Sequence, residues 1–107
     1  MWIATTDGFY STVQKPGQKN DVTVRSRVKA DLEKLMNRIG VDTKIVENAG
    51  TDYPFRIIVR KELWLKYLKE AGQSINYDNF KNTLNPKDDV RHAAYFKVWA
   101  ALRMLED

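Results

Sequence analysis

Residues 21–40 read DVTVRSRVKADLEKLMNRIG, and the spacing of their apolar side chains changes part-way along. In the first seven residues the valines alternate with Thr23 and two arginines, which predicts a strand with one solvated face. From Val28 the apolar residues recur at helical spacing, and Gly40 follows as a C-terminal cap. A strand that leads directly into an amphipathic helix indicates a sheet with helices packed on it.

The rest of the chain supplies further strand and helix patterns. The expected strands are 2–5, 9–14, 21–27, 43–47 and 55–60, and the expected helices are 28–39, 61–71, a short one at 77–84, and 88–106. Asp7 and Gly8 separate the first two strands, where glycine is expected to supply the positive φ of a tight turn. This order predicts an α+β fold: a mostly antiparallel sheet of about five strands with helices packed on one face, a two-layer sandwich.

The composition is typical of one globular domain spanning residues 1–107, with 43% hydrophobic and 30% charged side chains. Eighteen Lys and Arg against fourteen Asp and Glu give a net charge of +4, which permits anionic partners without identifying one. With no Cys and a single His, His92, we expect no disulfide, no thiol catalysis, no metal site and no cofactor. No stretch is apolar for long enough to span a membrane, and the opening lacks an export signal, so a cytoplasmic location is expected.

Alternation along the strands gathers one set of aromatic and basic side chains on the face away from the helices. The valines, with Phe55, Ile57 and Val59, are expected to face the helices. The opposite face would collect Trp2, Tyr10, Thr12, Arg25, Arg27, Arg56 and Arg60. Rings stack on bases and guanidinium groups bind phosphate, so this face suits a nucleotide. The alternatives are a solvated face or a face buried against another subunit.

A second group of amide and aromatic side chains lies at residues 75–82. Asn79 can hydrogen-bond a base edge, and Lys81 can neutralise a phosphate together with Arg91. The same residue types also cap helices and build turns, with Tyr77 and Phe80 anchoring a short helix. Both interpretations remain open.

The last expected helix carries apolar residues around most of its circumference. An aliphatic stripe and an aromatic group cover it: Val90, Ala94, Val98, Ala101, Leu102 and Leu105, and then Tyr95, Phe96, Trp99 and Met104. The helix is either clamped between the sheet and the helix near Trp64, or part of a subunit interface.

Patterns that indicate catalysis are weak. The serines and His92 do not form a recognisable nucleophile motif, and the five glycines are too scattered for a phosphate-binding loop. A lone His on a helix is more often structural than catalytic. We therefore do not expect an enzyme.

Several segments together resemble one family of small proteins of bacteria and tailed phages, most of which have no assigned function. They are MWIATTDGFYS at 1–11, VRSR at 24–27, DYPFRI at 52–57, NYDNFK at 76–81, HAAY at 92–95 and VW at 98–99. The sequence is also similar to phage immune-evasion proteins of the anti-CBASS sponge kind. That resemblance implies an oligomer that binds a cyclic dinucleotide signal without cleaving it, and it transfers no site residue.

These observations predict a non-enzymatic homo-oligomer that sequesters a cyclic dinucleotide or a related immune-signalling nucleotide, in the host cytoplasm if a phage encodes it. Base stacking is expected from Trp2, Tyr10 and Tyr53, hydrogen bonds from Thr12 and Asn79, and phosphate binding from Arg25, Arg27, Arg56 and Lys81. The alternatives are a protein-interaction module that occludes a host complex and, less favoured, a binder of single-stranded nucleic acid.

Overall fold

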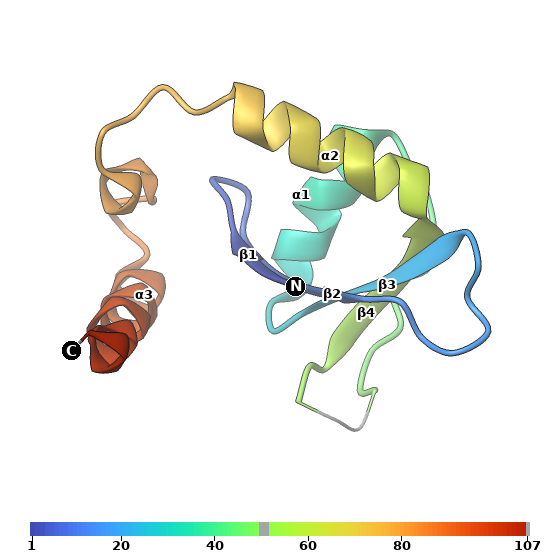
Figure 1. Ribbon diagram of the computed structural model, residues 1–107, viewed down its shortest axis with the longest axis horizontal. Coiled ribbons are helices and arrows are strands. Elements are labelled where there is room, and N and C mark those ends of the chain that lie inside the picture. The colour runs from blue at the N-terminus through green and yellow to red at the C-terminus, as the bar shows by residue number, and fades with distance from the viewer. Residues whose placement is uncertain (50–51, 107) are drawn as a thin grey trace. The chain divides into compact units, whose positions relative to one another are not determined.

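Four strands form one antiparallel sheet in the computed structural model, which describes residues 1–49 and 52–106 (Figure 1). The strands are β1 (Trp2–Ala4), β2 (Phe9–Val13), β3 (Asp21–Ser26) and β4 (Phe55–Arg60), in the spatial order β1-β2-β3-β4. Two helices, α1 (Lys29–Ile39) and α2 (Lys61–Gln73), cover the same face of this sheet. The predicted α+β fold, with an antiparallel sheet and helices on one face, is confirmed.

The hydrophobic core lies between the sheet and these two helices. Its buried members are Tyr10, Val22, Val24, Leu32, Leu35, Ile39, Ile57, Val59, Trp64 and Tyr67. The ring of Tyr10 meets Trp64 and Tyr67 edge-on, with centroids 6.3 and 6.0 Å away. Because a large apolar side chain contributes about 1.5–3 kcal/mol when fully buried, this cluster is what holds α1 and α2 on the sheet.

The segment at residues 43–47 does not form the fifth strand that the sequence predicts. Val46 makes one isolated antiparallel bridge to Arg56, and the two residues exchange backbone hydrogen bonds of 2.9 and 3.1 Å. Asn48 then adopts a left-handed backbone with φ of 53°, and the Ala49 N–H donates to the Pro54 carbonyl at 3.2 Å. In residues 1–49 and 52–106, regular pairing along that edge is limited to the bridge between Val46 and Arg56.

The turn between β1 and β2 needs Gly8 for a reason other than the expected positive φ. Thr5 N–H donates to the Gly8 carbonyl at 2.9 Å, and among the described glycines a positive φ occurs at Gly17 and Gly40. A Cβ at position 8 would lie 2.6 Å from Oδ2 of Asp31, whose Oδ2 also accepts the Phe9 N–H at 3.1 Å. Gly8 is required because the Cβ and the carboxylate of Asp31 together occupy the space that a side chain at position 8 would need.

Contacts within the chain group it into two compact units, Met1–Ile75 and Asn76–Asp107. The sheet, α1 and α2 make up the first unit. The single domain expected from the sequence stays a prediction.

The second unit contains α3 (Asp89–Leu102) and the short 3-10 helices η1 (Phe80–Thr83) and η2 (Arg103–Leu105). The Asp88 carboxylate caps α3 by accepting the Arg91 N–H at 3.0 Å. The helices expected at 77–84 and 88–106 are therefore present but shorter, with 3-10 geometry at η1 and η2. None of the helices in the described part of the chain is long and apolar enough to cross a membrane.

Candidate anion-binding site

The face of the sheet opposite α1 and α2, called the open face below, carries one row of side chains that crosses all four strands. Residues directly opposite each other in antiparallel strands point to the same face. The register pairs Trp2 with Ser11, and Ser11 with Arg25. Arg25 is in turn paired with Arg56. These four residues form the cross-strand row, which runs from β1 to β4.

Two like charges are neighbours in the cross-strand row. Arg25 and Arg56 stand directly opposite each other on β3 and β4, an arrangement that destabilises a sheet unless something compensates the charge. Arg25 donates from Nη2 to Ser11 Oγ at 2.7 Å. At the other end of the same strand pair, Arg60 stands opposite Asp21 instead. Positive charge is thus concentrated at one end of the open face.

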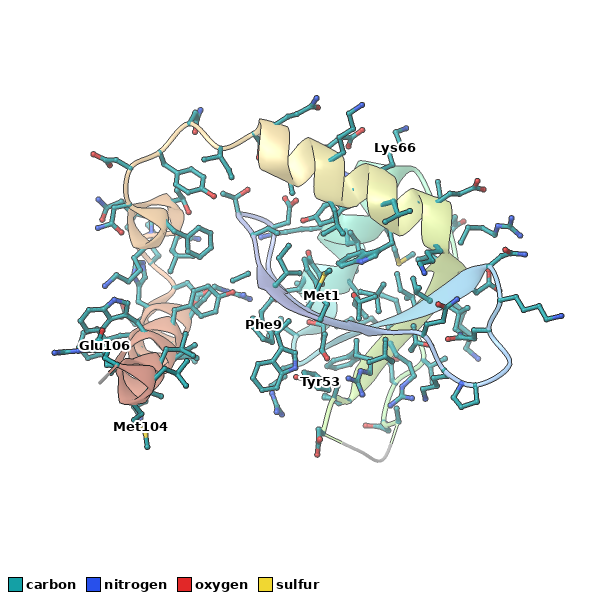
Figure 2. All side chains as sticks on the ribbon, viewed as in Figure 1. Met1, Phe9, Tyr53, Lys66, Met104 and Glu106 are labelled. Atoms are coloured by element: carbon teal, nitrogen blue, oxygen red, sulfur yellow. The ribbon has the colours of Figure 1, made fainter. Side chains whose placement is uncertain are left out.

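Tyr53 lies on the side of the sheet away from the helices (Figure 2). Its ring contacts the guanidinium group of Arg27 as well as that of Arg25. Cζ of Arg25 and Cζ of Arg27 lie 4.8 and 4.7 Å from the centroid of its ring. Arg27 Nη1 also donates to the Asp52 carbonyl at 2.6 Å. Within residues 1–49 and 52–106, neither Arg25 nor Arg27 forms an ion pair with a carboxylate. Two such guanidinium groups beside one ring create a positive potential suited to an anion.

Trp2 presents an exposed ring at the β1 end of the cross-strand row. Its side chain is 75% exposed, and its ring meets that of Phe9 with centroids 6.4 Å apart. Phe9 belongs to the open face because it pairs with Ala4, two residues along from Trp2. Trp2 therefore has one neighbouring ring for support and a free surface for stacking.

Two predicted site residues lie on the core face instead. The register pairs Thr12 with Val24, so Thr12 and Tyr10 share the face of the buried valines. Tyr10 is fully buried, and its hydroxyl donates to the Asp31 carbonyl at 2.8 Å. The prediction that Tyr10 and Thr12 lie on the open face was wrong, because the assumed phase of β2 was off by one residue. The β2 residue that lies on the open face beside Arg25 is Ser11, which the sequence did not predict as a site residue.

Tyr53 does not present the free ring that was expected of it. Its side chain is only 5% exposed, beneath the guanidinium groups of Arg25 and Arg27. In this arrangement Tyr53 positions the two arginines rather than stacking on a base. The structure thus brings together Trp2, Arg25, Arg27, Tyr53 and Arg56 among the predicted site residues.

Asn79 and Lys81 belong to the second unit. Asn79 Oδ1 accepts the Lys81 N–H at 3.1 Å and so caps η1. The Lys81 ammonium lies 4.7 Å from the centroid of Trp99 and 5.7 Å from that of Phe96. These contacts match the capping interpretation of the 75–82 segment, and a role in phosphate binding stays a prediction.

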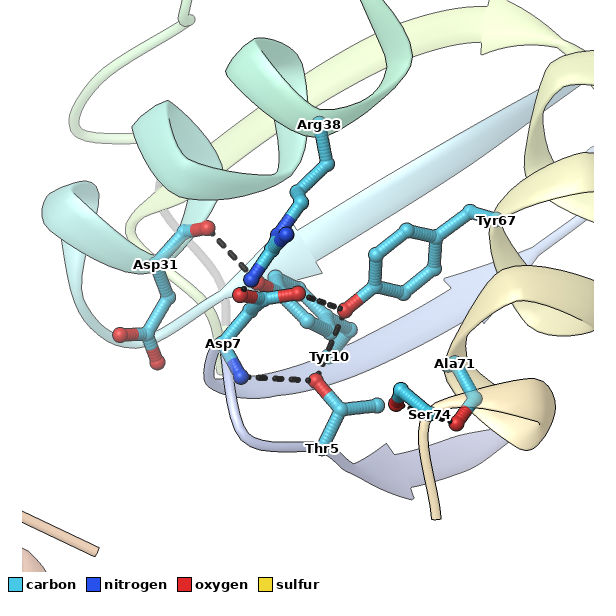
Figure 3. A network of polar contacts seen from close by, with 8 residues as sticks. All are labelled: Thr5, Asp7, Tyr10, Asp31, Arg38, Tyr67, Ala71 and Ser74. Carbon is cyan, nitrogen blue, oxygen red and sulfur yellow. Dashed lines mark hydrogen bonds and ion pairs between the residues drawn. The ribbon is translucent and has the colours of Figure 1, made fainter. Parts of the chain in front are cut away.

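A polar network fixes the β1–β2 turn against the helices (Figure 3). The Tyr67 hydroxyl donates to Asp7 Oδ2 at 2.8 Å, and Thr5 Oγ1 lies 2.7 Å from the same hydroxyl. Arg38 Nε donates to the second Asp7 oxygen at 3.1 Å. Burial raises the pKa of the Tyr67 hydroxyl and of the neighbouring Tyr10 hydroxyl. The network borders a hollow of about 90 Å³, and its mutual hydrogen bonds indicate a structural role.

Comparisons of the chain with protein-family models, with curated proteins and with solved structures find no match. Within residues 1–49 and 52–106, no group of three or more His, Cys, Asp or Glu side chains could hold a metal ion.

Proposed function

We propose that the protein binds and sequesters a cyclic dinucleotide or a related phosphorylated signalling nucleotide on the open face, without converting it chemically. The observation that carries the proposal is the directly opposed pair of Arg25 and Arg56, in one row with the exposed Trp2. Arginine forks bind phosphate oxygens through paired, charge-assisted hydrogen bonds, and two opposed guanidinium groups can bind the same phosphate.

The spacing of the cross-strand row suits a nucleotide. Neighbouring strands lie about 4.8 Å apart, so Arg25 stands roughly 10 Å from Trp2 along the row. A base stacked on Trp2 would place its sugar over Ser11 and its phosphate at Arg25 and Arg56. Arg27, held next to Arg25 by Tyr53, adds a second cation on the same side.

The resemblance to immune-evasion sponge proteins supports the ligand class. A sponge requires ring stacking and cations for phosphate but no hydrolytic groups, and the cross-strand row offers the first two. The same resemblance supports a homo-oligomer that acts in the cytoplasm of a bacterial host.

The aliphatic stripe of α3 favours a second candidate function, a protein-interaction module. Within the second unit, rings on one side of α3 have partners: Phe80 stacks on Tyr95 at 6.1 Å, and Lys81 lies on Trp99. The stripe itself is solvent-accessible, with exposed fractions of 82% for Val90, 51% for Val98 and 58% for Leu102. An apolar stripe of this kind is typical of a surface that binds another protein.

The double variant Arg25→Ala/Arg56→Ala tests the proposed function. Calorimetry would measure the affinity of the wild type and the variant for cyclic dinucleotides, cyclic trinucleotides, linear nucleotides and a short single-stranded oligonucleotide at two salt concentrations. Removing two charged hydrogen-bond donors should weaken binding by roughly 100-fold or more. Arg60→Ala is the matched control, because Arg60 lies on the same face of β4 but opposite Asp21, and its affinity should stay within about threefold of wild type.

Three results would contradict the proposal. Unchanged affinity in a double variant that circular dichroism shows to be folded would exclude the open face as the site. Oligonucleotide binding that falls steeply with salt would favour the single-stranded nucleic acid interpretation. A wild-type protein that binds none of these compounds would leave the interaction module as the better candidate.

A further inference from the structure

The ring of Trp2 is held in a way that presents one surface to a ligand. The side chain is 75% exposed on β1, and Phe9 meets the ring with an interplanar angle of 60°. A tilted contact of this kind restricts the orientation of the indole without covering it. The remaining surface is available for a flat partner such as a nucleobase.

The neighbours of Trp2 offer little that could read the edge of a base. On the open face of β1 and β2 the other side chains are Ala4, Phe9, Ser11 and Val13. Ser11 is the polar residue among these four, and it is buried with its Oγ 2.7 Å from Arg25 Nη2. A base at Trp2 is therefore held through its π-face rather than through hydrogen bonds to its edge.

We infer that Trp2 makes the site selective for purine over pyrimidine nucleotides, an inference that rests on the proposed function because Arg25 and Arg56 supply the phosphate contacts. The indole is bicyclic, so a bicyclic purine covers more of it than a pyrimidine does, and stacking strengthens with the overlapped area. Adenine and guanine differ at their edges, so the site treats them alike.

The inference is tested by calorimetry with ADP, GDP, CDP, UDP and inorganic pyrophosphate on the wild type, Trp2→Ala and Trp2→Phe. ADP and GDP should bind with affinities within about threefold of each other, and roughly tenfold more tightly than CDP and UDP. Trp2→Ala should weaken the two purine nucleotides by roughly 5- to 100-fold and abolish the preference. Trp2→Phe should retain part of it. Pyrophosphate affinity should be the same in all three proteins.

The outcomes separate this inference from the proposed function. Equal affinities for the four nucleotides, all lost in Arg25→Ala, would overturn the purine preference and leave the site in place. A purine preference that survives Trp2→Ala would overturn the role of Trp2. A more than tenfold difference between ADP and GDP would show that the base edge is read. Failure of the wild type to bind any nucleotide or pyrophosphate would overturn both proposals.

Discussion

Replacing Gly8 by Ala tests the contact that joins the β1–β2 turn to α1. The added Cβ would lie 2.6 Å from Oδ2 of Asp31. Asp31 is only 2% exposed, and the same oxygen accepts the Phe9 N–H at 3.1 Å. The carboxylate therefore cannot move away from position 8 without weakening that hydrogen bond, so either the turn or the Asp31 side chain must shift.

The size of the effect follows from two contributions to the free energy of unfolding. Overpacking a filled interior costs about 1–3 kcal/mol. Weakening a hydrogen bond to a charged acceptor costs up to about 1.5–3 kcal/mol more. We expect Gly8→Ala to lower the stability by about 2–5 kcal/mol and the thermal midpoint by roughly 10–25 °C for a domain of this size.

Urea denaturation followed by circular dichroism would measure this change. Gly72→Ala is the matched control, because Gly72 lies inside α2 with nothing within 4 Å of an added Cβ, so it should stabilise the protein by about 0.5–1 kcal/mol. In Gly8→Ala/Asp31→Gly both the carboxylate and the Cβ that obstruct position 8 are gone, and the double variant should lose less stability than the sum of the single variants. A Gly8→Ala protein within about 0.5 kcal/mol of wild type would refute the reasoning.

Two further predictions concern pH. Burial raises the pKa of the Tyr10 and Tyr67 hydroxyls above the ordinary value of about 10. Above pH 10 the unfolded chain loses these protons more readily than the folded protein does. The stability that the two hydroxyls contribute should therefore be fully present below pH 10 and decline at higher pH. Tyr10→Phe should flatten that decline in urea titrations, and an unchanged slope would contradict the assignment. The Arg91 backbone N–H holds the pKa of the Asp88 carboxyl below its usual range, so the cap on α3 should be present at neutral pH and weaken as acid protonates Asp88. Asp88→Ala should increase amide exchange in the first turn of α3 already at neutral pH, and equal exchange in both proteins would argue against the cap.

The phase of the strands could be predicted only where apolar and polar side chains alternate along the sequence. In β3 Val22 and Val24 alternate with charged or polar side chains, and in β4 the same pattern holds except at Ile58, so the alternation predicted which residues face the helices. The three central residues of β2, Tyr10, Ser11 and Thr12, all carry hydroxyl groups and are all buried, so no such alternation distinguishes its two faces. The errors at Tyr10 and Thr12 follow from that composition.

The candidate site depended on information of two kinds. Alternation alone indicated that Arg25 and Arg56 share a face. Their direct opposition depends on the register between β3 and β4, and these strands are separated in sequence by α1 and a long connection. The contact of Arg27 with Tyr53 joins a strand end to a distant loop, which no periodic pattern encodes. The reason for Gly8 likewise lies in a residue 23 positions away.

The order β1-β2-β3-β4 also determines what a growing chain exposes as it leaves the ribosome. The first three strands are complete at Ser26, when Val22 and Val24 still have an uncovered apolar face. α1 follows at once with Leu32 and Leu35, and at about 5–20 residues per second its residues are added within roughly three seconds. The incomplete sheet is therefore covered by α1 before β4 and α2 have left the ribosome, which shortens the period in which nascent chains can aggregate through its apolar face.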